Sequence, residues 1–375
     1  MRHFKIILVF GTRPEAIKMA PLFLQLQKHG EFEPVIVITA QHRDMLDQVM
    51  DIFEMTPCHD LDLMKPDQPI THVVSQGIEK LFTIISSEKP DGVLVHGDTT
   101  TTFVASLASF YARVPVGHIE AGLRTGNIYS PFPEEMNRRL TSRVAAWHFA
   151  PTDGARSNLL REGIADHSIA VTGNTVIDAL RIAIEKPFEF NHPKLRELIE
   201  ENRKIILVTA HRRENFGAPL NNLFSDLLDF VAENEDFHIV YPVHPNPNVL
   251  KPATEKLVHP RILLVQPLDY LPFVNLMNHC FAIVTDSGGL QEEAPGLGKP
   301  VIVFRDTTER PEAIEAGTAI LAGTERGNVL GHLKRLVLEP EFFKTMAQAT
   351  NPFGDGNASI RIVDFLRSRL LETDQ

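Results

Sequence analysis

Short runs of apolar residues alternate with longer amphipathic segments through most of the chain, and this alternation constrains the fold more than any other feature. Continuous apolar runs are typical of strands that are covered on both faces, as in parallel sheets. Helical segments between them indicate βαβ units and doubly wound sheets of the α/β class. We expect strands at Lys5–Phe10, Pro34–Thr39, Gly92–His96, Val114–His118, Ala145–Ala150, Ser168–Thr172, Lys204–Thr209, His238–Val243, Arg261–Val265, Phe281–Thr285 and Pro300–Phe304.

The predicted strands fall into two series, which are separated by a stretch of different composition. Residues 185–203 contain two prolines and a dense mixture of charges, which indicates a helix and a linker. We therefore expect two doubly wound domains, at residues 1–180 and 181–356. The C-terminal segment, residues 357–375, has helical periodicity and can join the first domain.

Composition disfavours several classes of function. The chain of 375 residues has 37 Lys and Arg against 48 Asp and Glu, so its net charge is −11. A nucleic-acid partner is disfavoured, because such partners need a basic surface. The N-terminal apolar run meets Gly11 and Pro14 too early for a secretory leader, and no uninterrupted apolar stretch approaches a membrane span. We therefore expect a cytoplasmic protein without membrane contact.

Metals and redox cofactors are disfavoured by the motifs that the sequence lacks. The two cysteines, Cys58 and Cys280, stand far apart and outside any zinc spacing, and we expect both to be buried and reduced. No group of Asp and His residues has the spacing of a metal site. No GxGxxG fingerprint follows the first strand, so a tightly bound dinucleotide is also disfavoured. The sequence therefore predicts chemistry without a cofactor.

Unusual polar residues follow the carboxyl ends of the predicted strands. In open α/β sheets, ligands bind outside these ends. Two such sheets with facing edges would make one cleft between the domains. We therefore expect the active site in this cleft, whatever reaction it carries out. The polar segments are Gly11–Glu15, Gln41–His42, His96–Thr99, His118–Gly122, His211–Asn215, His244–Asn246, Asp286–Gly289 and Arg305–Thr307.

The segment after the first strand has the features of a capped helix start. Thr12 and Glu15 have capping-box spacing, and Pro14 suits the first helical turn. The N–H groups of a helix start attract an anion, and Arg13 stands beside them. We expect Arg13 to contact a phosphate, the alternative being a surface arginine. Lys18 lies one turn further on, where a ligand contact and a solvated lysine are equally open.

A second helix start follows a strand in the other half of the chain. Ser287 can cap this helix, and Gly288 and Gly289 let a ligand approach the backbone. Glu293 follows within about two helical turns. This combination suits a nucleotide-sugar, whose diphosphate would bind the amides and whose sugar hydroxyls would bind the carboxylate. The alternative is a turn that merely tolerates glycine.

Two further groups of the second half are candidates for ligand contacts. Arg310 lies in a loop dense in hydrogen-bonding groups, and we expect it to face the cleft and bind phosphate or sugar, the alternative being a solvated charge cluster. His211 follows a strand and precedes two arginines. A histidine at such a position is a candidate for function, although most histidines are structural.

Acidic residues follow the strands of the first half. Asp98 and Glu120 each end a buried strand, where a charged side chain needs a partner or a role. Glu134 and Glu135 follow residues 131–133, which we expect to form a rigid and exposed loop. Carboxylates held away from bulk water serve as general acids and bases. The first half is therefore expected to supply proton transfer.

At the level of whole motifs, the chain resembles the non-hydrolysing UDP-N-acetylglucosamine 2-epimerases, and the resemblance runs from about Ile6 to the C-terminus. It implies a GT-B-like fold of two Rossmann-like domains with the active site between them. It also implies a homodimer that serves bacterial surface polysaccharide synthesis, and activation by UDP-N-acetylglucosamine at a second site. The motifs that carry it are FGTRPEAIKMAPL, HGDTTT, HIEAGLRTGN, PFPEEMNRRL, AHRREN, TDSGGLQEEAPGLGKPVIVFRDTTERPEA and EAGTAILAGT.

The resemblance also implies roles for individual residues. One departure is Leu268, which stands where some members carry glutamine, so that side-chain recognition of uracil is in doubt there. The catalytic carboxylates would be Asp98, Glu120 and Glu134. The nucleotide and phosphate ligands would be Arg13, His211, Phe273, Ser287, Gly288, Gly289, Glu293 and Arg310, with His211 also a catalytic candidate. The neighbourhood of the activator site would include Gln41, Glu135, Arg212 and His244.

The reaction that the resemblance implies is inversion at C2 of UDP-N-acetylglucosamine, giving UDP-N-acetylmannosamine. The C2 proton is not next to a carbonyl group, so its direct removal would be very costly. Elimination of UDP to a glycal, followed by re-addition, avoids that cost and needs no oxidation. Three alternatives remain open at this point: a hydrolysing epimerase that releases N-acetylmannosamine and UDP, a GT-B glycosyltransferase, and a non-catalytic nucleotide-sugar sensor.

Overall fold

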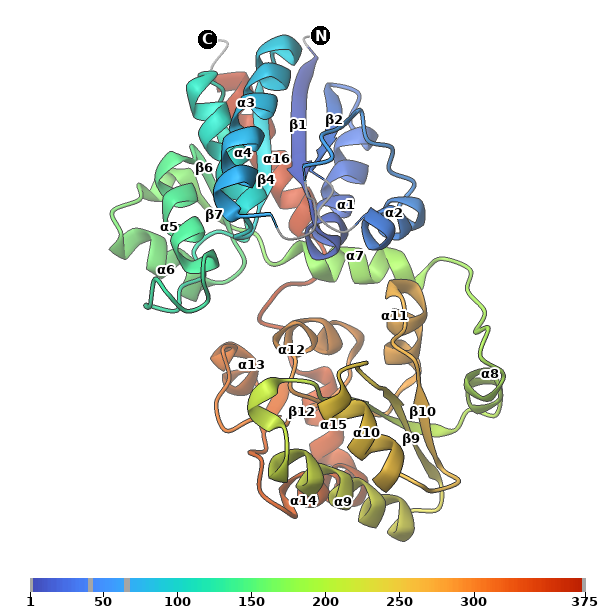
Figure 1. The fold of residues 1–375 in the computed structure, drawn as a ribbon. Helices are drawn as coiled ribbons and strands as arrows, with labels where there is room; N and C mark the ends of the chain where they lie inside the picture. The colour runs from blue at the N-terminus through green and yellow to red at the C-terminus, as the bar shows by residue number, and fades with distance from the viewer. Residues whose placement is uncertain (1–2, 40–42, 64–67, 373–375) are drawn as a thin grey trace. The chain divides into compact units, whose positions relative to one another are not determined.

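The computed structural model describes residues 3–39, 43–63 and 68–372. It divides into two compact units (Figure 1). Unit 1 contains the chain up to Ile182 together with the segment from Phe353 onward, and unit 2 contains Ala183–Pro352. Each unit is built on one parallel sheet with helices between successive strands, which is the doubly wound arrangement that the apolar runs predict.

Within the described residues, the sheet of unit 1 has seven strands in the order β3-β2-β1-β4-β5-β6-β7. All its strand pairs are parallel. The strands are β1 (Phe4–Phe10), β2 (Phe32–Ile38), β3 (His59–Asp60), β4 (Gly92–His96), β5 (Val116–Ile119), β6 (Trp147–Ala150) and β7 (Ile169–Val171).

The described part of unit 2 repeats this pattern with six parallel strands in the order β10-β9-β8-β11-β12-β13. The strands are β8 (Lys204–Thr209), β9 (Phe237–Pro242), β10 (Ile262–Val265), β11 (Ala282–Thr285), β12 (Val301–Val303) and β13 (Ala319–Leu321).

The order of strands fixes where each unit can bind a ligand. In both sheets the chain moves outward in one direction, returns to the first strand and moves outward in the other direction, as in Rossmann folds. The reversal lies between β1 and β4 in unit 1 and between β8 and β11 in unit 2. We call these two places the switch points. Loops after the flanking strands part there and leave a crevice for ligands.

The helices connect the strands and cover the sheets (Figure 1). Helix α7 (Thr175–Ile184) runs across the boundary between the units, and α16 (Ala358–Glu372) packs against α1 of unit 1. The other helices of unit 1 are α1 (Arg13–Lys28), α2 (Arg43–Ile52), α3 (Ile70–Glu88), α4 (Thr100–Tyr111), α5 (Glu134–Val144), α6 (Asp153–Arg161) and the 3-10 helix η1 (Asp166–Ser168).

Unit 2 has its own set of helices. They are α8 (Pro193–Glu200), α9 (Ala218–Glu233), α10 (Pro247–Lys256), α11 (Tyr270–His279), α12 (Gly288–Glu293), α13 (Pro311–Glu315), α14 (Asn328–Leu338) and α15 (Pro340–Gln348), with the 3-10 helices η2 (Arg213–Asn215) and η3 (Ala294–Leu297).

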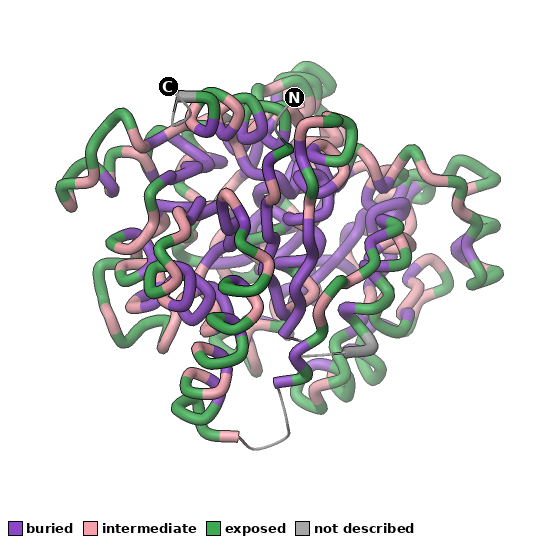
Figure 2. The backbone as a smooth tube through the Cα atoms, turned by 90° about the horizontal axis from the view of Figure 1, so that it is seen from above, coloured by how far each residue is buried: buried purple, intermediate pink, exposed green. Residues whose placement is uncertain are grey.

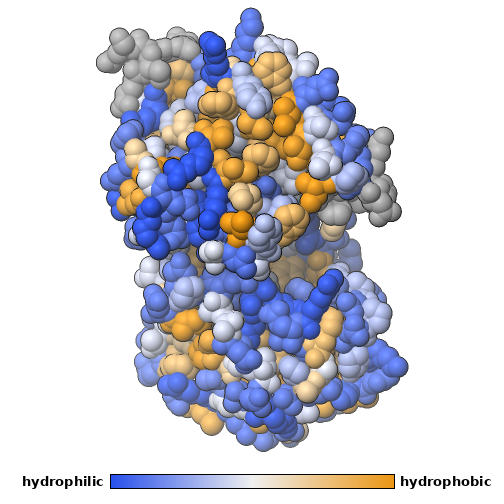
Figure 3. Space-filling view, turned by 60° about the vertical axis from the view of Figure 1, so that its left-hand side comes forward, coloured by the Kyte–Doolittle hydropathy of each residue, from blue (hydrophilic) through white to orange (hydrophobic). Residues whose placement is uncertain are grey.

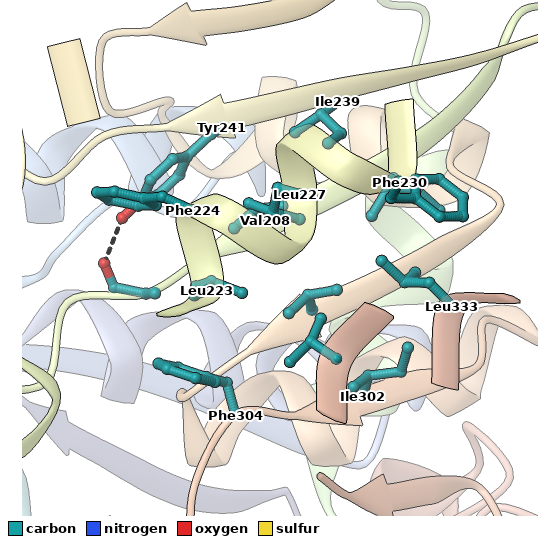
Figure 4. Close-up of a cluster of buried hydrophobic side chains, with 14 of the residues drawn as sticks. Val208, Leu223, Phe224, Leu227, Phe230, Ile239, Tyr241, Ile302, Phe304 and Leu333 are labelled. Atoms are coloured by element: carbon teal, nitrogen blue, oxygen red, sulfur yellow. Dashed lines mark hydrogen bonds between the residues drawn. The ribbon is translucent and has the colours of Figure 1, made fainter. Parts of the chain in front are cut away.

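The central strands are buried on both faces, as the continuous apolar runs require (Figure 2). In unit 2, Phe224 and Phe230 of α9 pack with Ile302 and Phe304 around the sheet (Figure 4). Burial of each such side chain contributes about 1.5–3 kcal/mol. Tyr241 lies in the same cluster, and its hydroxyl donates to the Ala210 carbonyl at 2.5 Å. Because the faces are filled, only the strand ends remain for ligand binding.

Two short strands, β3 and β13, escape the sequence prediction. β3 consists of His59 and Asp60, which carry no apolar signal, and β13 has three residues at the edge of its sheet. The expectation of two buried cysteines is wrong for Cys58, which is exposed before this edge strand, whereas Cys280 is buried. Within the described residues, every helix is too short or too polar to cross a membrane.

Candidate active site

The switch point of unit 1 is held together by the Glu15 carboxylate. Glu15 is 2% exposed and belongs to the capping box with Thr12 that the sequence predicts. One carboxylate oxygen accepts from the backbone N–H groups of Gly11 and Thr12, at 3.0 and 2.8 Å. The other accepts from the hydroxyls of Thr99 and Thr102 at the start of α4, at 2.6 and 3.2 Å. One buried side chain therefore ties the loop after β1 to the loop after β4.

Three polar side chains contact Glu120, which directly follows β5. The Lys18 ammonium and the Asn174 amide both donate to one oxygen of Glu120, the second at 2.8 Å. His96 Nε2 lies 3.5 Å from the same oxygen. Burial alone would raise the pKa of Glu120, but the charge of Lys18 and the contacts with His96 outweigh it and hold that pKa well below its usual range. Glu120 is therefore an anion at neutral pH, with Lys18 as its counter-ion.

Asp98, two residues beyond β4, has an arginine as its partner. Arg138 of α5 contacts one oxygen of Asp98 through Nε and Nη2, at 2.8 and 2.6 Å. Asn137 donates to the Asp98 carbonyl at 2.9 Å, so α5 also fixes the backbone there. Glu134 is the first residue of the same helix and is half-buried. The structure thus brings Asp98 and the start of α5 into one neighbourhood.

Glu135 has a different environment from its neighbour in the sequence. Its side chain is fully buried, and the backbone N–H of Thr125 donates to it at 3.0 Å. Arg138 and Arg139 pair with its two oxygens at 3.2 and 3.1 Å. Burial would raise the pKa of Glu135, but these hydrogen bonds and charges lower it. Glu135 joins the 125–126 loop to α5.

In unit 2 the corresponding carboxylate is that of Asp286, at the end of β11. We call Glu15 and Asp286 the ties of their switch points. Asp286 is fully buried. Its Oδ2 accepts from the backbone N–H groups of His211 and Arg212, at 2.9 and 2.8 Å, and from the Asn215 amide at 3.1 Å. The loop after β8 is thereby held against the end of β11. Asp286 lies beside the predicted glycine turn, but its burial cannot be recognised from the motif.

His211 occupies the surface of this switch point. Its ring stacks on His244, with centroids 5.4 Å apart and planes 12° from parallel. Its Nδ1 lies 3.7 Å from Asp286 Oδ1. Burial lowers the pKa of His211, opposed by the negative charge of Asp286 and assisted by His244 and Arg212. The arrangement places two predicted residues, His211 and His244, in direct contact.

The glycine turn lies at the start of α12. Ser287 occupies the N-cap position, but the expected capping bond from its side chain is absent in this described segment; its N–H instead donates to the Thr285 hydroxyl at 2.9 Å. A Cβ added to Gly288 would meet only Arg212 Nη2, at 3.9 Å, so the backbone is open to an approaching ligand. A Cβ added to Gly289 would lie 3.2 Å from a carboxylate oxygen of Glu293, which places Glu293 beside the turn.

Two arginines near the glycine turn of unit 2 are paired with acids. Arg310 precedes α13, and its Nε donates to Glu292, a buried residue that sequence reasoning passed over in favour of Glu293. Arg212 pairs with Glu309 at 3.5 Å. These contacts hold both guanidinium groups in the described loops. Phe273 lies in the first turn of α11 and is half-buried.

The remaining predicted residues are placed as follows. Arg13 is the first residue of α1 and is half-buried, with no ion pair to any other residue that the structure describes. Gln41 lies outside the described residues. No group of three or more His, Cys, Asp and Glu side chains within the described ranges could hold a metal ion.

Comparison with known proteins decides the family. The sequence model of the family described as UDP-N-acetylglucosamine 2-epimerase matches residues 24–367. The chain is 52% identical to the UDP-N-acetylglucosamine 2-epimerase of Salmonella typhimurium over 370 residues, which cover 97% of this chain and 98% of that protein. The chain belongs to the UDP-N-acetylglucosamine 2-epimerase family.

Two solved structures of this family agree with the fold. A crystal structure from Listeria monocytogenes, titled as a putative UDP-N-acetylglucosamine 2-epimerase, is 49% identical and matches with a TM-score of 0.94, covering 99% of this chain and 97% of that one. The Neisseria meningitidis UDP-GlcNAc 2-epimerase bound to UDP-GlcNAc is 51% identical, with a TM-score of 0.84, covering 97% and 100%. The predicted α/β class with two Rossmann-like, GT-B-like sheets is confirmed.

Proposed function

We propose that this chain is an isomerase that interconverts UDP-N-acetylglucosamine and UDP-N-acetylmannosamine without hydrolysing them. The observation that carries the proposal is the Neisseria relative, which is 51% identical over 97% of this chain and was solved bound to UDP-GlcNAc. The chemistry of the two switch points supports it. Unit 2 offers backbone amides and arginines for a diphosphate, and unit 1 offers carboxyl groups for proton transfer.

Unit 2 is proposed to bind UDP. The diphosphate would lie on the amides of Ser287, Gly288 and Gly289, where the open backbone at Gly288 leaves room for it. Arg310 and His211 would add positive charge to the departing phosphate, together with Arg13 of unit 1. Charge that develops in the transition state is stabilised best by groups that are already fixed in place, and the contacts of Arg310 with Glu292 fix it.

Unit 1 is proposed to act on the sugar. Inversion at C2 needs a group that removes a proton on one face and a group that returns it on the other. We assign these tasks to Asp98 and Glu134. Asp98 is positioned by Arg138, and Glu134 starts the same helix. Glu120, an anion paired with Lys18, would orient the sugar or tune the other two carboxylates.

The proposed reaction conserves every atom of the substrate. A base takes the C2 proton while the C1–O bond breaks, its electron pair leaving with UDP, and a glycal remains. UDP then adds back to C1, and a proton reaches C2 from the opposite face. No electron is gained or lost, so the reaction needs no redox partner.

Incubation with UDP-N-acetylglucosamine in D₂O tests the proposal. We expect deuterium at C2 and accumulation of UDP-N-acetylmannosamine, followed by NMR. Release of free N-acetylmannosamine and UDP would show a hydrolysing epimerase instead. Binding of the nucleotide-sugar without exchange at C2 would show a non-catalytic sensor, and turnover that needs an added acceptor would show a glycosyltransferase.

We also propose a homodimer that forms through unit 1. Helices α3, α4 and α5 pack side by side, and apolar side chains gather on the upper part of Figure 3, which is unit 1. Exposed apolar patches of this kind mark association surfaces. Substitution of Phe110 by Glu should give a monomer in sedimentation experiments. The exposed apolar residues of these helices are Ile70, Phe82, Phe110, Tyr111 and Leu140.

We also propose that a second molecule of UDP-N-acetylglucosamine activates the reaction. The residues proposed to take part are Gln41, Glu135, Arg212 and His244. Arg212 and His244 line the same face of unit 2 as His211, so they are available to a nucleotide near it. Glu135 would act through the 125–126 loop that it anchors. The rate of UDP-N-acetylmannosamine conversion should rise when a trace of UDP-N-acetylglucosamine is added, and Arg212→Ala should weaken that rise.

A further inference from the structure

The two carboxylate oxygens of Asp286 have unequal surroundings. Oδ2 accepts from two backbone N–H groups and one amide, from His211, Arg212 and Asn215. Oδ1 is equally buried, yet no residue in the described part of the chain donates a hydrogen bond to it. A buried carboxylate oxygen without a donor is costly, by about 1–3 kcal/mol or more, so it calls for an explanation.

The imidazole of His211 lies close to this oxygen. The distance from His211 Nδ1 to Asp286 Oδ1 is 3.7 Å, which a small rotation of the ring would shorten to a hydrogen bond. The ring is held in its plane by stacking on His244. The His211 side chain is 44% exposed, so its other nitrogen, Nε2, remains accessible to a ligand.

We propose that Asp286 is the counter-ion of His211, and that binding of a diphosphate makes His211 take up a proton. Nδ1–H then donates to Asp286 Oδ1 and Nε2–H donates to a phosphate oxygen. The inference rests on the proposed function, because it takes the ligand to be the diphosphate of a nucleotide-sugar. It assigns Asp286 as a positioning residue, which acts on the substrate through His211.

The charges around His211 explain why protonation is coupled to the ligand. Burial, His244 and Arg212 disfavour the imidazolium, and only Asp286 favours it. The pKa of His211 is therefore below its ordinary value in the unliganded chain, and the ring is mostly neutral at neutral pH. A bound diphosphate adds negative charge on the open side of the ring. The pKa of His211 then rises, and one proton moves from the buffer to the imidazole.

The variant Asp286→Asn tests the negative charge of Asp286 separately from its hydrogen bonds to the loop after β8. The amide oxygen of Asn can still accept the three hydrogen bonds that hold the loop after β8. Its NH₂ group replaces the buried acceptor with a donor and removes the negative charge. Nδ1 of His211 would then accept rather than donate, which disfavours the imidazolium.

Calorimetric titration with UDP-N-acetylglucosamine, in buffers of different ionisation enthalpy, counts the protons taken up. This ligand is a diphosphate diester and has no proton of its own that titrates near neutral pH. For the unaltered chain we expect proton uptake, and affinity that weakens by up to about tenfold per pH unit as pH rises, the limit for one proton. Asp286→Asn and His211→Gln should both bind more weakly and lose the uptake.

Two matched variants control for unrelated effects. Asp226→Asn removes another buried carboxylate of unit 2, one that accepts from the backbone of Gly327 and Leu330, and it should retain proton uptake. His238→Gln removes another histidine of unit 2, one whose pKa is also lowered by burial, and it should also retain the uptake. If Asp286→Asn fails to fold, the pKa of His211 can be followed by NMR in the unaltered chain, with His211→Gln for assignment; it should rise when UDP-N-acetylglucosamine binds.

Each outcome decides one question. Binding without proton uptake, or uptake that persists in His211→Gln, would overturn the counter-ion proposal and leave the proposed function intact. Uptake that disappears in His238→Gln alone would likewise overturn it. If UDP-N-acetylglucosamine fails to bind the unaltered chain at all, the proposed function falls and the counter-ion proposal falls with it.

Discussion

At the switch point of each unit, one buried carboxylate links the loop after the first strand of the sheet to the loop after the fourth. In unit 1, Glu15 follows β1 and reaches Thr99 and Thr102 beyond β4. In unit 2, Asp286 follows β11 and reaches back to His211 and Arg212 beyond β8. In both, loops that are far apart in the sequence are fixed by one side chain.

The two carboxylates differ in how many of their oxygens accept hydrogen bonds. Both oxygens of Glu15 have hydrogen-bond donors, from backbone amides on one side and threonine hydroxyls on the other. Asp286 has donors at Oδ2 alone among the described residues, and Oδ1 faces the His211 ring. A fully satisfied carboxylate holds structure, whereas a partly satisfied one keeps an oxygen available for function.

The surroundings of the two ties differ in charge as well. The candidate residues beside the unit 1 tie are carboxylates, and each has a cation as a partner: Lys18 for Glu120 and Arg138 for Asp98. The candidate residues beside the unit 2 tie include Arg212 and Arg310, which pair with Glu309 and Glu292, and the open backbone of Gly288. Under the proposed function, the same strand order would support proton transfer in one unit and anion binding in the other.

The largest expected effect concerns the acids of unit 1. Asp98→Asn should lower turnover about 10²–10⁴-fold, because it removes a group to which we assign proton transfer. Steady-state kinetics with UDP-N-acetylglucosamine measures it, and the binding constant of UDP should change little. Near-full turnover in both Asp98→Asn and Glu134→Gln would contradict the division of labour between the units.

The next effect tests whether Arg310 holds structure or binds ligand. Arg310→Ala leaves the buried Glu292 without its arginine and should lower the free energy of unfolding by about 3 kcal/mol. Urea denaturation measures the loss.

A double variant with Arg310→Met and Glu292→Met should recover most of that stability, because no buried charge remains unpaired. Its affinity for UDP should be lower than that of the unaltered chain, because Arg310 is absent. Normal UDP affinity in the double variant would mean that Arg310 only supports the fold, and the cationic role assigned to unit 2 would lose one of its members.

A smaller effect compares the two ties directly. Glu15→Gln places an amide NH₂ against donors that need an acceptor, and should cost about 1–3 kcal/mol of stability. The proton uptake that accompanies ligand binding should not change. Calorimetry of Glu15→Gln beside Asp286→Asn checks this contrast, and a similar loss of uptake in both would erase the difference between the ties.

The smallest effect is on acid stability. His118 of β5 is fully buried, its Nε2 lies 2.7 Å from the Gly97 carbonyl in the loop that carries Asp98, and burial lowers its pKa to about 3. The unfolded chain binds this proton more tightly, with a pKa of about 6.5. The stabilisation is therefore complete above that pH and is lost as pH falls toward the pKa of the folded state.

Between about pH 7.5 and 5.5, His118 alone should reduce the free energy of unfolding by roughly 1.4 kcal/mol. Urea denaturation at the two pH values measures the difference, and His118→Gln should reduce it. An equal slope in the variant would show that other groups, such as the buried His148, account for the acid sensitivity.

The strands were the most predictable part of the fold. All eleven apolar runs contain strands of the two sheets, because burial on both faces imposes a continuous apolar pattern that is visible locally. The capping box of Thr12 and Glu15 was predictable for the same reason, since its spacing is a property of one helix start. The edge strands β3 and β13 were too short to give a signal.

Partners of the candidate residues were much less predictable. Arg138 and Asn174 are absent from the predicted site, although they hold Asp98 and Glu120. His96 lies in a predicted polar segment but was given no role, although it contacts Glu120. Glu292 and Glu293 are adjacent acids, and only the packing of α12 decides which one is buried against Arg310. The sequence contains both residues but no mark that separates them.

By itself, the sequence determined that two parallel sheets form and that polar residues gather where their strands end. Those features depend on patterns within single strands and helix starts. Only the tertiary structure decided which carboxylate meets which cation. Lys18 and Glu120 are 102 residues apart, and His211 and Asp286 are 75 apart. The order of strands in each sheet brings them together, and that order follows from packing across the whole unit rather than from any local signal.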